Sequence, residues 1–235
     1  MFQCSRELIT DKITKDIMIK VKTFVVNPFQ ENTYVLYDET GECVIVDAGI
    51  FTDEEKRNLD AFIASNNLTP KKLLNTHGHI DHIAGIEYLS KKYGIELYMH
   101  SDDIDNINRS AAMGAAFGFN IEVPTCKVNF VKEGDSISFG NSHLQVIELP
   151  GHTKGGVGFY SPEQQIIMVG DTLFRGSIGR TDLPGGDYET IIKSIIKKLL
   201  PLGDEVRYYS GHGESSTLGH ERRYNPFVNE HPFEF

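Results

Sequence analysis

One short motif constrains this chain more than any other segment, and it reads Thr76-His77-Gly78-His79-Ile80-Asp81-His82. It follows a predicted strand, 71–75, and precedes a predicted helix, 83–92. Side chains two residues apart in an extended loop point to the same side, so His77, His79 and Asp81 are expected to face one point. The last histidine of the motif joins them where the helix begins. Such groups are rarely buried unpaired, so the motif predicts metal ligands; the alternative is a solvated polar loop.

Three further predicted strands, 143–149, 165–169 and 205–210, each end beside glycine and one possible ligand. These ligands are His152, Asp171 and His212. Loops at strand ends are where a rigid scaffold presents chemistry, and glycine lets the chain turn sharply there. A single histidine after a strand is usually a surface residue. Together with the first motif, however, the chain offers five histidines and two aspartates at four strand ends.

These seven side chains divide into two groups of three with one carboxylate left to bridge them. The first group is His77, His79 and His152, the second is Asp81, His82 and His212, and the bridge is Asp171. Nitrogen and oxygen ligands without sulfur favour zinc and are also compatible with iron or manganese. The sequence therefore predicts two divalent ions.

Composition limits the class of protein. The 235 residues carry a formal net charge of −10, which argues against a nucleic-acid partner. The chain has no apolar run near the roughly 18 residues that a membrane helix needs, and residues 1–12 lack the apolar stretch of a secretory signal. The three cysteines are widely spaced, which favours a reducing compartment and hence a cytoplasmic location. The sequence predicts no particular oligomeric state.

The order of predicted elements indicates the architecture. Residues 1–17 are interpreted as an N-terminal extension or an extra strand, with Met18 as a possible start, and 18–235 as one domain. Strands are followed by helices, then strands again, then a helix. Helices are expected at 54–66, 83–92, 101–117 and 188–200. Because strands and helices do not alternate strictly, we expect an α/β fold of two packed mixed β-sheets with helices on the outer faces.

The motif HxHxDH, followed by single His, Asp and His residues, resembles that of the metallo-β-lactamase superfamily. This resemblance spans residues 77–212 and implies the αββα sandwich of that superfamily. It also implies the division of ligands given above, position by position. Asp47, after the third predicted strand, matches a family position that orients the ligands; the alternative is a turn-forming aspartate before Ala48-Gly49.

Within the superfamily, the chain is similar to the glyoxalase II-like hydroxyacylglutathione hydrolases, in their short single-domain branch. True β-lactamases lack the bridging aspartate, and flavodiiron proteins carry Glu where His79 stands. The matching segments are Asn27-Pro28-Phe29-Gln30-Glu31-Asn32, Gly170-Asp171-Thr172-Leu173-Phe174, Gly179-Arg180-Thr181-Asp182 and Gly211-His212-Gly213. Only 23 residues follow His212, too few for the helical region that holds glutathione in full-length enzymes.

The resemblance implies a hydrolase that cleaves an S-acylglutathione-like thioester with a hydroxide bridging two metals. Asp81 and Asp171 would then be catalytic, and the substrate would be a small-molecule thioester or ester. Arg180 matches a basic family position and is expected to contact a substrate carboxylate; the alternative is a surface ion pair with Asp182. Asp182 stands where the family has the tyrosine that binds glutathione, so recognition of that tripeptide stays open.

Three other functions remain open from the sequence. A persulfide dioxygenase would use one iron held by His77, His152 and Asp171. A lactonase or other esterase would use the same two-metal centre with a different pocket. A metal-binding fold without catalysis is the last possibility, although seven ligands would then have no use.

Overall fold

Two six-stranded sheets form the centre of the computed structural model, which describes residues 18–229. The first has the order β1-β2-β3-β4-β5-β6 and consists of β1 (Lys20–Val26), β2 (Glu31–Tyr37), β3 (Glu42–Val46), β4 (Thr69–Leu74), β5 (Glu96–Met99) and β6 (Val128–Phe130). The second has the order β14-β13-β10-β9-β8-β7 and consists of β7 (Ser136–Phe139), β8 (Ser142–Glu148), β9 (Val157–Ser161), β10 (Ile166–Gly170), β13 (Arg207–Ser210) and β14 (Ser216–Thr217). A separate hairpin joins β11 (Leu173–Phe174) to β12 (Ser177–Ile178).

Both sheets are mixed, as the sequence predicts. In the first sheet β1, β2 and β3 pair antiparallel, whereas β3, β4, β5 and β6 pair parallel. In the second sheet β7 to β10 pair antiparallel and β10 pairs parallel with β13. The parallel connections need crossover segments, and helices supply them.

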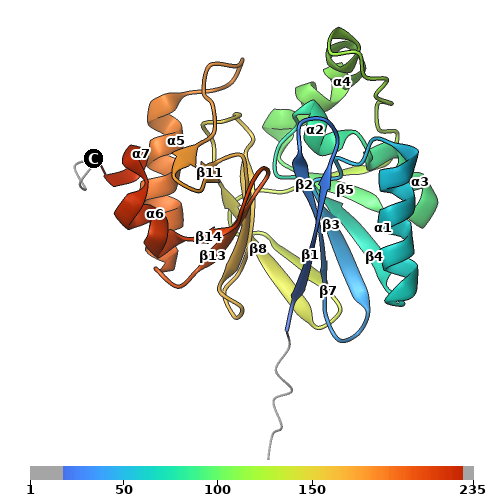
Figure 1. Ribbon diagram of the computed structural model, residues 1–235, viewed down its shortest axis with the longest axis horizontal. Helices are drawn as coiled ribbons and strands as arrows, with labels where there is room; N and C mark the ends of the chain where they lie inside the picture. The colour runs from blue at the N-terminus through green and yellow to red at the C-terminus, as the bar shows by residue number, and fades with distance from the viewer. Residues whose placement is uncertain (1–17, 230–235) are drawn as a thin grey trace, which may run out of the picture.

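Helices cover both outer faces (Figure 1). Helices α1 (Asp53–Ser65), α3 (Ile86–Tyr93) and α4 (Ile104–Ala116) lie on the side of the first sheet, and α5 (Tyr188–Ser194), α6 (Leu218–Tyr224) and α7 (Pro226–Asn229) lie on the side of the second. The short helix α2 (Ile80–Ile83) lies at one end of the sandwich. Three short turns complete the helical structure: η1 (Ser101–Asp103), η2 (Ile195–Leu199) and η3 (Leu200–Leu202).

Three buried apolar clusters correspond to the three interfaces between these layers. Leu59 and Ile63 of α1 pack with Val35 and Ile45 of the first sheet. Between the two sheets the cluster is shared by both, with members that include Leu36, Val44, Val146 and Phe159. Against the second sheet, apolar residues of α5 and of the turn after it form the third cluster, with members that include Ile191, Ile192, Ile195 and Leu199. Together these layers form the predicted αββα sandwich.

The helix predicted at 83–92 is wrong in its bounds, because the chain forms two helices instead. Helix α2 begins inside the histidine motif at Ile80, and α3 begins after Gly85. At Gly85 the backbone passes close to Ile50: a Cβ there would lie 2.4 Å from Ile50 Cγ1. The Gly85 amide donates to the carbonyl of Ala48 at 2.7 Å instead of continuing one helix. The break therefore lets the motif and α3 take different directions.

Two other predicted helices are also divided. The segment predicted at 188–200 is α5 followed by the π-helical turn η2. The segment predicted at 101–117 begins with the 3₁₀ turn η1, and Ser101 lies inside that turn and does not cap it. The side chain of His100 accepts the amide hydrogen bond there, at 3.2 Å from Asp102 N. Residues 1–17 lie outside the described residues, so the interpretation of that segment and of 18–235 as one domain stays a prediction.

Candidate metal centre

All seven predicted ligands lie at one end of the sandwich, where loops from both sheets meet. The first sheet supplies the motif after β4, and the second supplies the loops after β8, β10 and β13. His77 and His79 lie in the loop, whereas Asp81 and His82 belong to helix α2. The expectation that Asp81 shares an extended loop with the two histidines is therefore wrong: extended backbone ends at His79, and a helical turn follows.

The first group of ligands brings three imidazole nitrogens together. His79 Nδ1 lies 3.1 Å from His77 Nε2 and 2.9 Å from His152 Nε2. Ring nitrogens that bind one ion at about 2.0–2.1 Å in a tetrahedral site lie about 3.3 Å apart. The spacing therefore fits three nitrogens directed at one ion.

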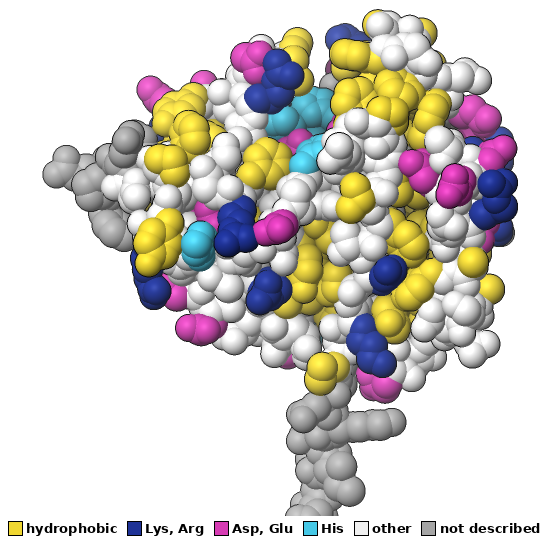
Figure 2. All heavy atoms as spheres, viewed as in Figure 1, with side chains coloured by type: hydrophobic (Ala, Val, Ile, Leu, Met, Phe, Trp, Pro, Cys, Tyr) yellow, Lys and Arg dark blue, Asp and Glu magenta, His cyan; other side chains and the backbone are white. Residues whose placement is uncertain are grey.

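The second group combines two imidazoles with a carboxylate. His212 Nε2 lies 3.2 Å from Asp81 Oδ2, and His82 Nε2 lies 3.7 Å from the same oxygen. The side chain of His212 is 25% exposed and that of Asp81 is 14% exposed, whereas His82 is fully buried. Figure 2 shows histidine side chains at the surface between the two halves of the molecule. The centre is therefore accessible from the His212 side.

Asp171 lies between the two groups. Its Oδ2 is 3.6 Å from His152 Nε2 and 3.6 Å from His212 Nε2, and its Oδ1 is 3.5 Å from His82 Nε2. One carboxylate thus faces nitrogens of both groups. This is the arrangement that a bridging ligand requires.

Backbone carbonyls determine which nitrogen two of the histidines offer. His152 Nδ1 lies 2.8 Å from the carbonyl oxygen of Arg180, and His212 Nδ1 lies 3.1 Å from that of Phe29. A carbonyl only accepts hydrogen bonds, so each Nδ1 carries the proton. The Nε2 lone pair is then free to bind a metal, which is the usual arrangement of a ligating histidine.

Asp47 connects the two groups from behind, in agreement with its predicted orienting role. Its Oδ2 lies 3.1 Å from His82 Nδ1 and accepts a hydrogen bond from Thr76 Oγ1 at 2.7 Å. Thr76 Oγ1 in turn lies 3.1 Å from His77 Nδ1. Asp47 Oδ1 accepts from the Thr76 amide at 2.7 Å and from Asn75 Nδ2 at 3.1 Å. Asp47 is 1% exposed, so its orientation is held by these contacts.

Burial and mutual repulsion favour the neutral form of two histidines in the first group, His77 and His79. Burial, together with the neighbouring His152 and His82, lowers the pKa of His79 to about 4. Burial and the surrounding imidazoles also lower the pKa of His77 well below its usual value. Neutral imidazoles are the form that binds metal ions.

Negative charge is concentrated around His82, where the carboxylates of Asp81, Asp171 and Asp47 meet. Burial works to raise the pKa of Asp81 and Asp171, but His82 and other nearby histidines lower both overall. Burial likewise works to lower the pKa of His82, but the carboxylates of Asp81, Asp171 and Asp47 raise it well above its usual value. Several buried side-chain atoms of the described residues have no hydrogen-bond partner, and His82 Nε2 and Asp171 Oδ1 are two of them. A cation at this point would satisfy both atoms, so the donor set fits a metal.

Arg180 does not face the centre with its guanidinium. Its Nε and Nη2 donate to the two carboxylate oxygens of Asp182, both at 2.7 Å, and both side chains are more than half exposed. This ion pair is the alternative to a substrate contact that the sequence left open. The main-chain carbonyl of Arg180 accepts a hydrogen bond from His152. Side-chain patterns in the sequence cannot reveal such a main-chain role.

Glu31 and Asn32 are functional candidates that sequence reasoning does not single out, although both lie in a segment that matches the family. Glu31 is fully buried, with its Oε1 3.8 Å from His82 Nδ1, and burial raises its pKa well above the usual value. Asn32 Nδ2 donates to the carbonyls of Ser210 and Gly213, at 3.1 and 2.9 Å, which flank His212. The signal is the matching segment itself, but the role of each residue depends on a distant contact. Glu31 faces His82, and Asn32 contacts residues 178 and 181 positions further along the chain.

Comparisons with known proteins agree with this geometry. A sequence model of the metallo-beta-lactamase superfamily matches residues 26–212. The chain is 37% identical over 213 residues to a hydroxyacylglutathione hydrolase of Haemophilus influenzae. The alignment covers 90% of this chain and 99% of the relative. The chain is 34% identical over 212 residues to a probable metallo-hydrolase of Bacillus subtilis, covering 90% and 98%. A protein crystallised in a di-iron-bound form superposes with a TM-score of 0.79 at 38% identity, covering 88% and 100%.

The chain therefore belongs to the metallo-β-lactamase superfamily, and it is a metallo-hydrolase of that superfamily with a glyoxalase II-like relative. The fold and the cluster of histidines and aspartates imply divalent metal ions. Across residues 18–229, no helix combines the length and the apolar character needed to span a membrane.

Proposed function

We propose that this chain is a thioester hydrolase of the glyoxalase II type, acting on an S-acylglutathione-like small molecule with two divalent ions. The observation that carries the proposal is the pair of donor groups with Asp171 between them. The hydroxyacylglutathione hydrolase relative supports the thioester substrate, and the di-iron form of the similar structure supports two metals. Zinc suits the nitrogen and oxygen donors, and iron and manganese are compatible with the same set.

His77, His79 and His152 would hold one ion, Asp81, His82 and His212 the other, and Asp171 both. When bound, divalent ions lower the pKa of water toward about 7 and polarise a carbonyl oxygen. The chain's own part is orientation: the carbonyls of Arg180 and Phe29 keep Nε2 of His152 and His212 free. Asp81 lies on the exposed side, where its carboxylate can accept a hydrogen bond from an incoming water.

The reaction needs little help from an acid. Water adds its oxygen to the acyl carbon, the C–S bond breaks, and the products are a carboxylic acid and a thiol. A thiol with a pKa near 8.5 leaves as the thiolate far more readily than an alkoxide does. This fits a centre composed of histidines and carboxylates.

The test combines metal content with turnover. We expect protein purified without added metal to contain about two metal ions per chain and to release thiol from S-lactoylglutathione. Asp171→Asn should lose metal and at least about 100-fold in kcat, because the shared ligand is gone. Asp38→Asn is the matched control, since Asp38 is also largely buried, at 3% exposed against 11% for the side chain of Asp171, but lies at the far end of the sheets. Two metals per chain with no thioester cleavage would contradict the proposed substrate and leave lactones and other esters to assay.

A persulfide dioxygenase is the second candidate, because Asp171 Oδ2 lies 3.6 Å from His152 Nε2 and His77 has a ring nitrogen within 4.8 Å of a ligand atom of each of these two residues. About one iron per chain, with oxygen uptake on glutathione persulfide and no thiol release, would establish that reaction and exclude the hydrolase. We favour the hydrolase because the donors for a second ion are present as well. The cytoplasmic location, the absence of a nucleic-acid partner and the contact of Arg180 with substrate remain predictions.

A further inference from the structure

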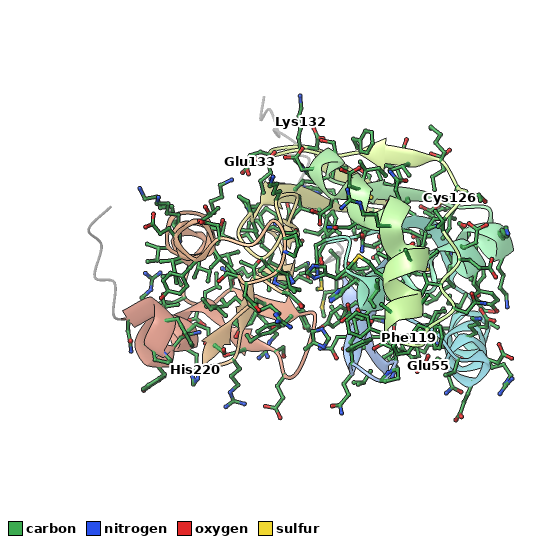
Figure 3. All side chains as sticks on the ribbon, turned by 90° about the horizontal axis from the view of Figure 1, so that it is seen from above. Glu55, Phe119, Cys126, Lys132, Glu133 and His220 are labelled. Atoms are coloured by element: carbon green, nitrogen blue, oxygen red, sulfur yellow. The ribbon has the colours of Figure 1, made fainter. Side chains whose placement is uncertain are left out.

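Three aromatic rings form an exposed surface beside the candidate metal centre. Phe29 lies on the turn between β1 and β2, and Phe117 follows the last residue of α4. Phe119 lies just beyond the end of α4, where Figure 3 labels it. The ring centroid of Phe29 is 6.1 Å from that of Phe117 and 5.4 Å from that of Phe119. Phe119 also packs on Phe51, with centroids 5.0 Å apart. We call Phe29, Phe117 and Phe119 the aromatic face.

The aromatic face is continuous with the second donor group. The carbonyl oxygen of Phe29 lies 3.1 Å from His212 Nδ1, so the residue that carries one ring also holds one ligand. Phe29 and Phe119 line a recess whose wall includes Asp81. Figure 2 shows hydrophobic side chains gathered over the end of α4 and the β1–β2 turn, beside the histidines. A molecule reacting at the centre therefore lies within reach of these rings.

Exposure and the lack of cations indicate what the aromatic face would bind. Phe117 is 62% exposed and Phe29 is 39% exposed. Contiguous exposed apolar surface beside a reactive site marks a binding site for an apolar group. The recess contains no lysine or arginine among its lining residues, which are Asn27, Phe29, Phe51, Ile80, Asp81, Ala84, Phe119 and Ile121. This lining does not suit the carboxylates of a peptide.

We propose that the aromatic face binds an uncharged, hydrophobic acyl group of the substrate. The inference rests on the proposed thioester hydrolase and adds the substrate class to it. The acyl substituent is bonded directly to the reacting carbonyl carbon, so it must lie beside the ligands, where Phe29 is. A short polar acyl group such as lactoyl would leave the rings in water.

The test uses glutathione thioesters with acetyl, butyryl, hexanoyl and octanoyl groups. Burying a methylene favours binding enough for about a two- to fourfold rise in kcat/KM per added methylene until the rings are covered. Phe117→Ala and Phe29→Ala should reduce the octanoyl-to-acetyl ratio of kcat/KM by about tenfold. Tyr224→Ala, which removes a 66% exposed ring on α6, is the matched control and should keep the ratio.

Several outcomes would overturn the proposal. One is a ratio that does not change with chain length, and another is a dependence only on the hydrophobicity of the thiol. A wild-type dimer that Phe117→Ala converts to a monomer in sedimentation would show that a second copy covers the rings. If no thioester is cleaved, the proposed function fails, and calorimetric titration with octanamide tests the face alone: wild type should bind and Phe117→Ala should not.

A second inference stands on a different observation, the buried carboxylate of Asp103. Asp103 is 1% exposed, and its Oδ2 accepts hydrogen bonds from the Gly78 amide at 2.8 Å and from Thr153 Oγ1 at 2.9 Å. Its Oδ1 accepts from the Gly155 amide at 3.0 Å. Gly78 lies between His77 and His79, and Thr153 follows His152. One side chain therefore joins the two loops that supply the first donor group.

The glycines show how closely these loops approach Asp103. A Cβ on Gly78 would lie 2.9 Å from the Asp103 carbonyl oxygen, and a Cβ on Gly155 would lie 2.7 Å from the Asp103 nitrogen. Neither position accepts a side chain without a shift of backbone. We infer that Asp103 is a positioning residue for the first donor group.

The test compares two buried aspartates. Asp38 accepts hydrogen bonds from Thr40, Asn141 and Ser142 and joins loops of both sheets at the far end from the centre. We expect Asp103→Asn and Asp38→Asn to lower the melting temperature similarly. Only Asp103→Asn should weaken metal binding, by about 10- to 100-fold in competition with a chelator. It should also change the visible spectrum of the Co²⁺-substituted protein, which reports ligand geometry.

Equal metal affinity and spectra in Asp103→Asn and wild type would refute the role, and so would equal metal loss in both variants. If Asp103→Asn does not fold, Thr153→Ala removes one of the three hydrogen bonds and provides the milder test. Its Co²⁺ spectrum should then differ from that of wild type, and an unchanged spectrum would refute the role as well.

Discussion

Each histidine of the centre offers one particular nitrogen, and its neighbours decide which. His79 presents Nδ1, whereas His77, His82, His152 and His212 present Nε2. In His152 and His212 the other nitrogen is held by a backbone carbonyl, and in His82 it faces Asp47. The affinity of the centre for metal therefore depends also on residues that do not touch the metal, because these residues orient the ligand nitrogens.

Asp47 gives the first prediction at the residue scale. Asp47→Asn replaces one accepting oxygen with an amide that faces donors, so His82 and Thr76 lose their orientation. We expect metal affinity to fall by about 10- to 100-fold, measured by competition with a chromogenic chelator. Asp182→Asn, an exposed carboxylate outside the donor groups, should leave the affinity unchanged.

The ion pair of Arg180 and Asp182 gives the second prediction at the residue scale. If Arg180 contacts a substrate carboxylate, Asp182 competes with that substrate for the guanidinium. Asp182→Asn should then lower KM for an anionic thioester severalfold at low salt and by little at high salt, because exposed charges are screened. Arg180→Gln should raise KM with kcat unchanged, and a neutral thioester should show neither effect. Steady-state kinetics in which both variants match wild type would exclude Arg180 from substrate binding.

Helices α1 and α3 are held together by one carboxylate, which is the clearest electrostatic contact between elements. Asp60 of α1 accepts hydrogen bonds from Lys92, from Tyr88 and, at 2.7 Å, from Tyr93. Helix α3 lies directly after the metal motif, and Gly94 ends it in the left-handed conformation. The direction of the motif therefore depends on how these two helices pack on the first sheet.

This contact predicts a pH dependence of stability. Burial works to raise the pKa of Asp60, but the hydrogen bonds from Lys92, Tyr88 and Tyr93 lower it overall. A carboxylate with a lowered pKa stabilises the fold above its ordinary value near 3.9, and the contribution is lost as the pH falls through the lowered value. We expect Asp60→Asn to reduce the free energy of unfolding by about 1.5 kcal/mol at pH 7, and by less at an acidic pH below the lowered pKa of Asp60. Urea unfolding at both pH values measures it; an equal loss at both would contradict the prediction.

The whole molecule is two halves that share one centre. The first sheet supplies four donors through one motif, and the second supplies three through three separate loops. Contacts such as Tyr34 Oη to the Ser210 carbonyl at 2.6 Å join the halves just behind His212. Ions bound between the halves should therefore stabilise the entire fold.

Removal of metal tests this coupling. A ligand at about 1,000 times its Kd stabilises a protein by about 4 kcal/mol, which corresponds to roughly 8–16 °C in the melting temperature of a chain of this size. We expect a chelator to lower the melting temperature by about that amount, and we expect added Zn²⁺ to restore the original melting temperature. His212→Ala, which removes one ligand of the second group, should show a smaller shift on chelation. A chelator that leaves the wild-type melting temperature unchanged would contradict the coupling.

The sequence by itself determined the superfamily, the two mixed sheets with outer helices, and the seven side chains expected at the centre. The superfamily follows from the resemblance carried by the HxHxDH motif and the His, Asp and His residues after it. The sheets, the helices and the seven side chains follow from local patterns: alternation along strands, periodicity along helices, and polar residues directly after strands. Only the tertiary structure decided that Gly85 divides a helix, that Asp103 faces the ligand loops, and that Glu31 lies beside His82. Each of these depends on a contact with a residue far along the chain, whose identity the local pattern does not specify. Such contacts exist only once distant segments of the chain have packed together.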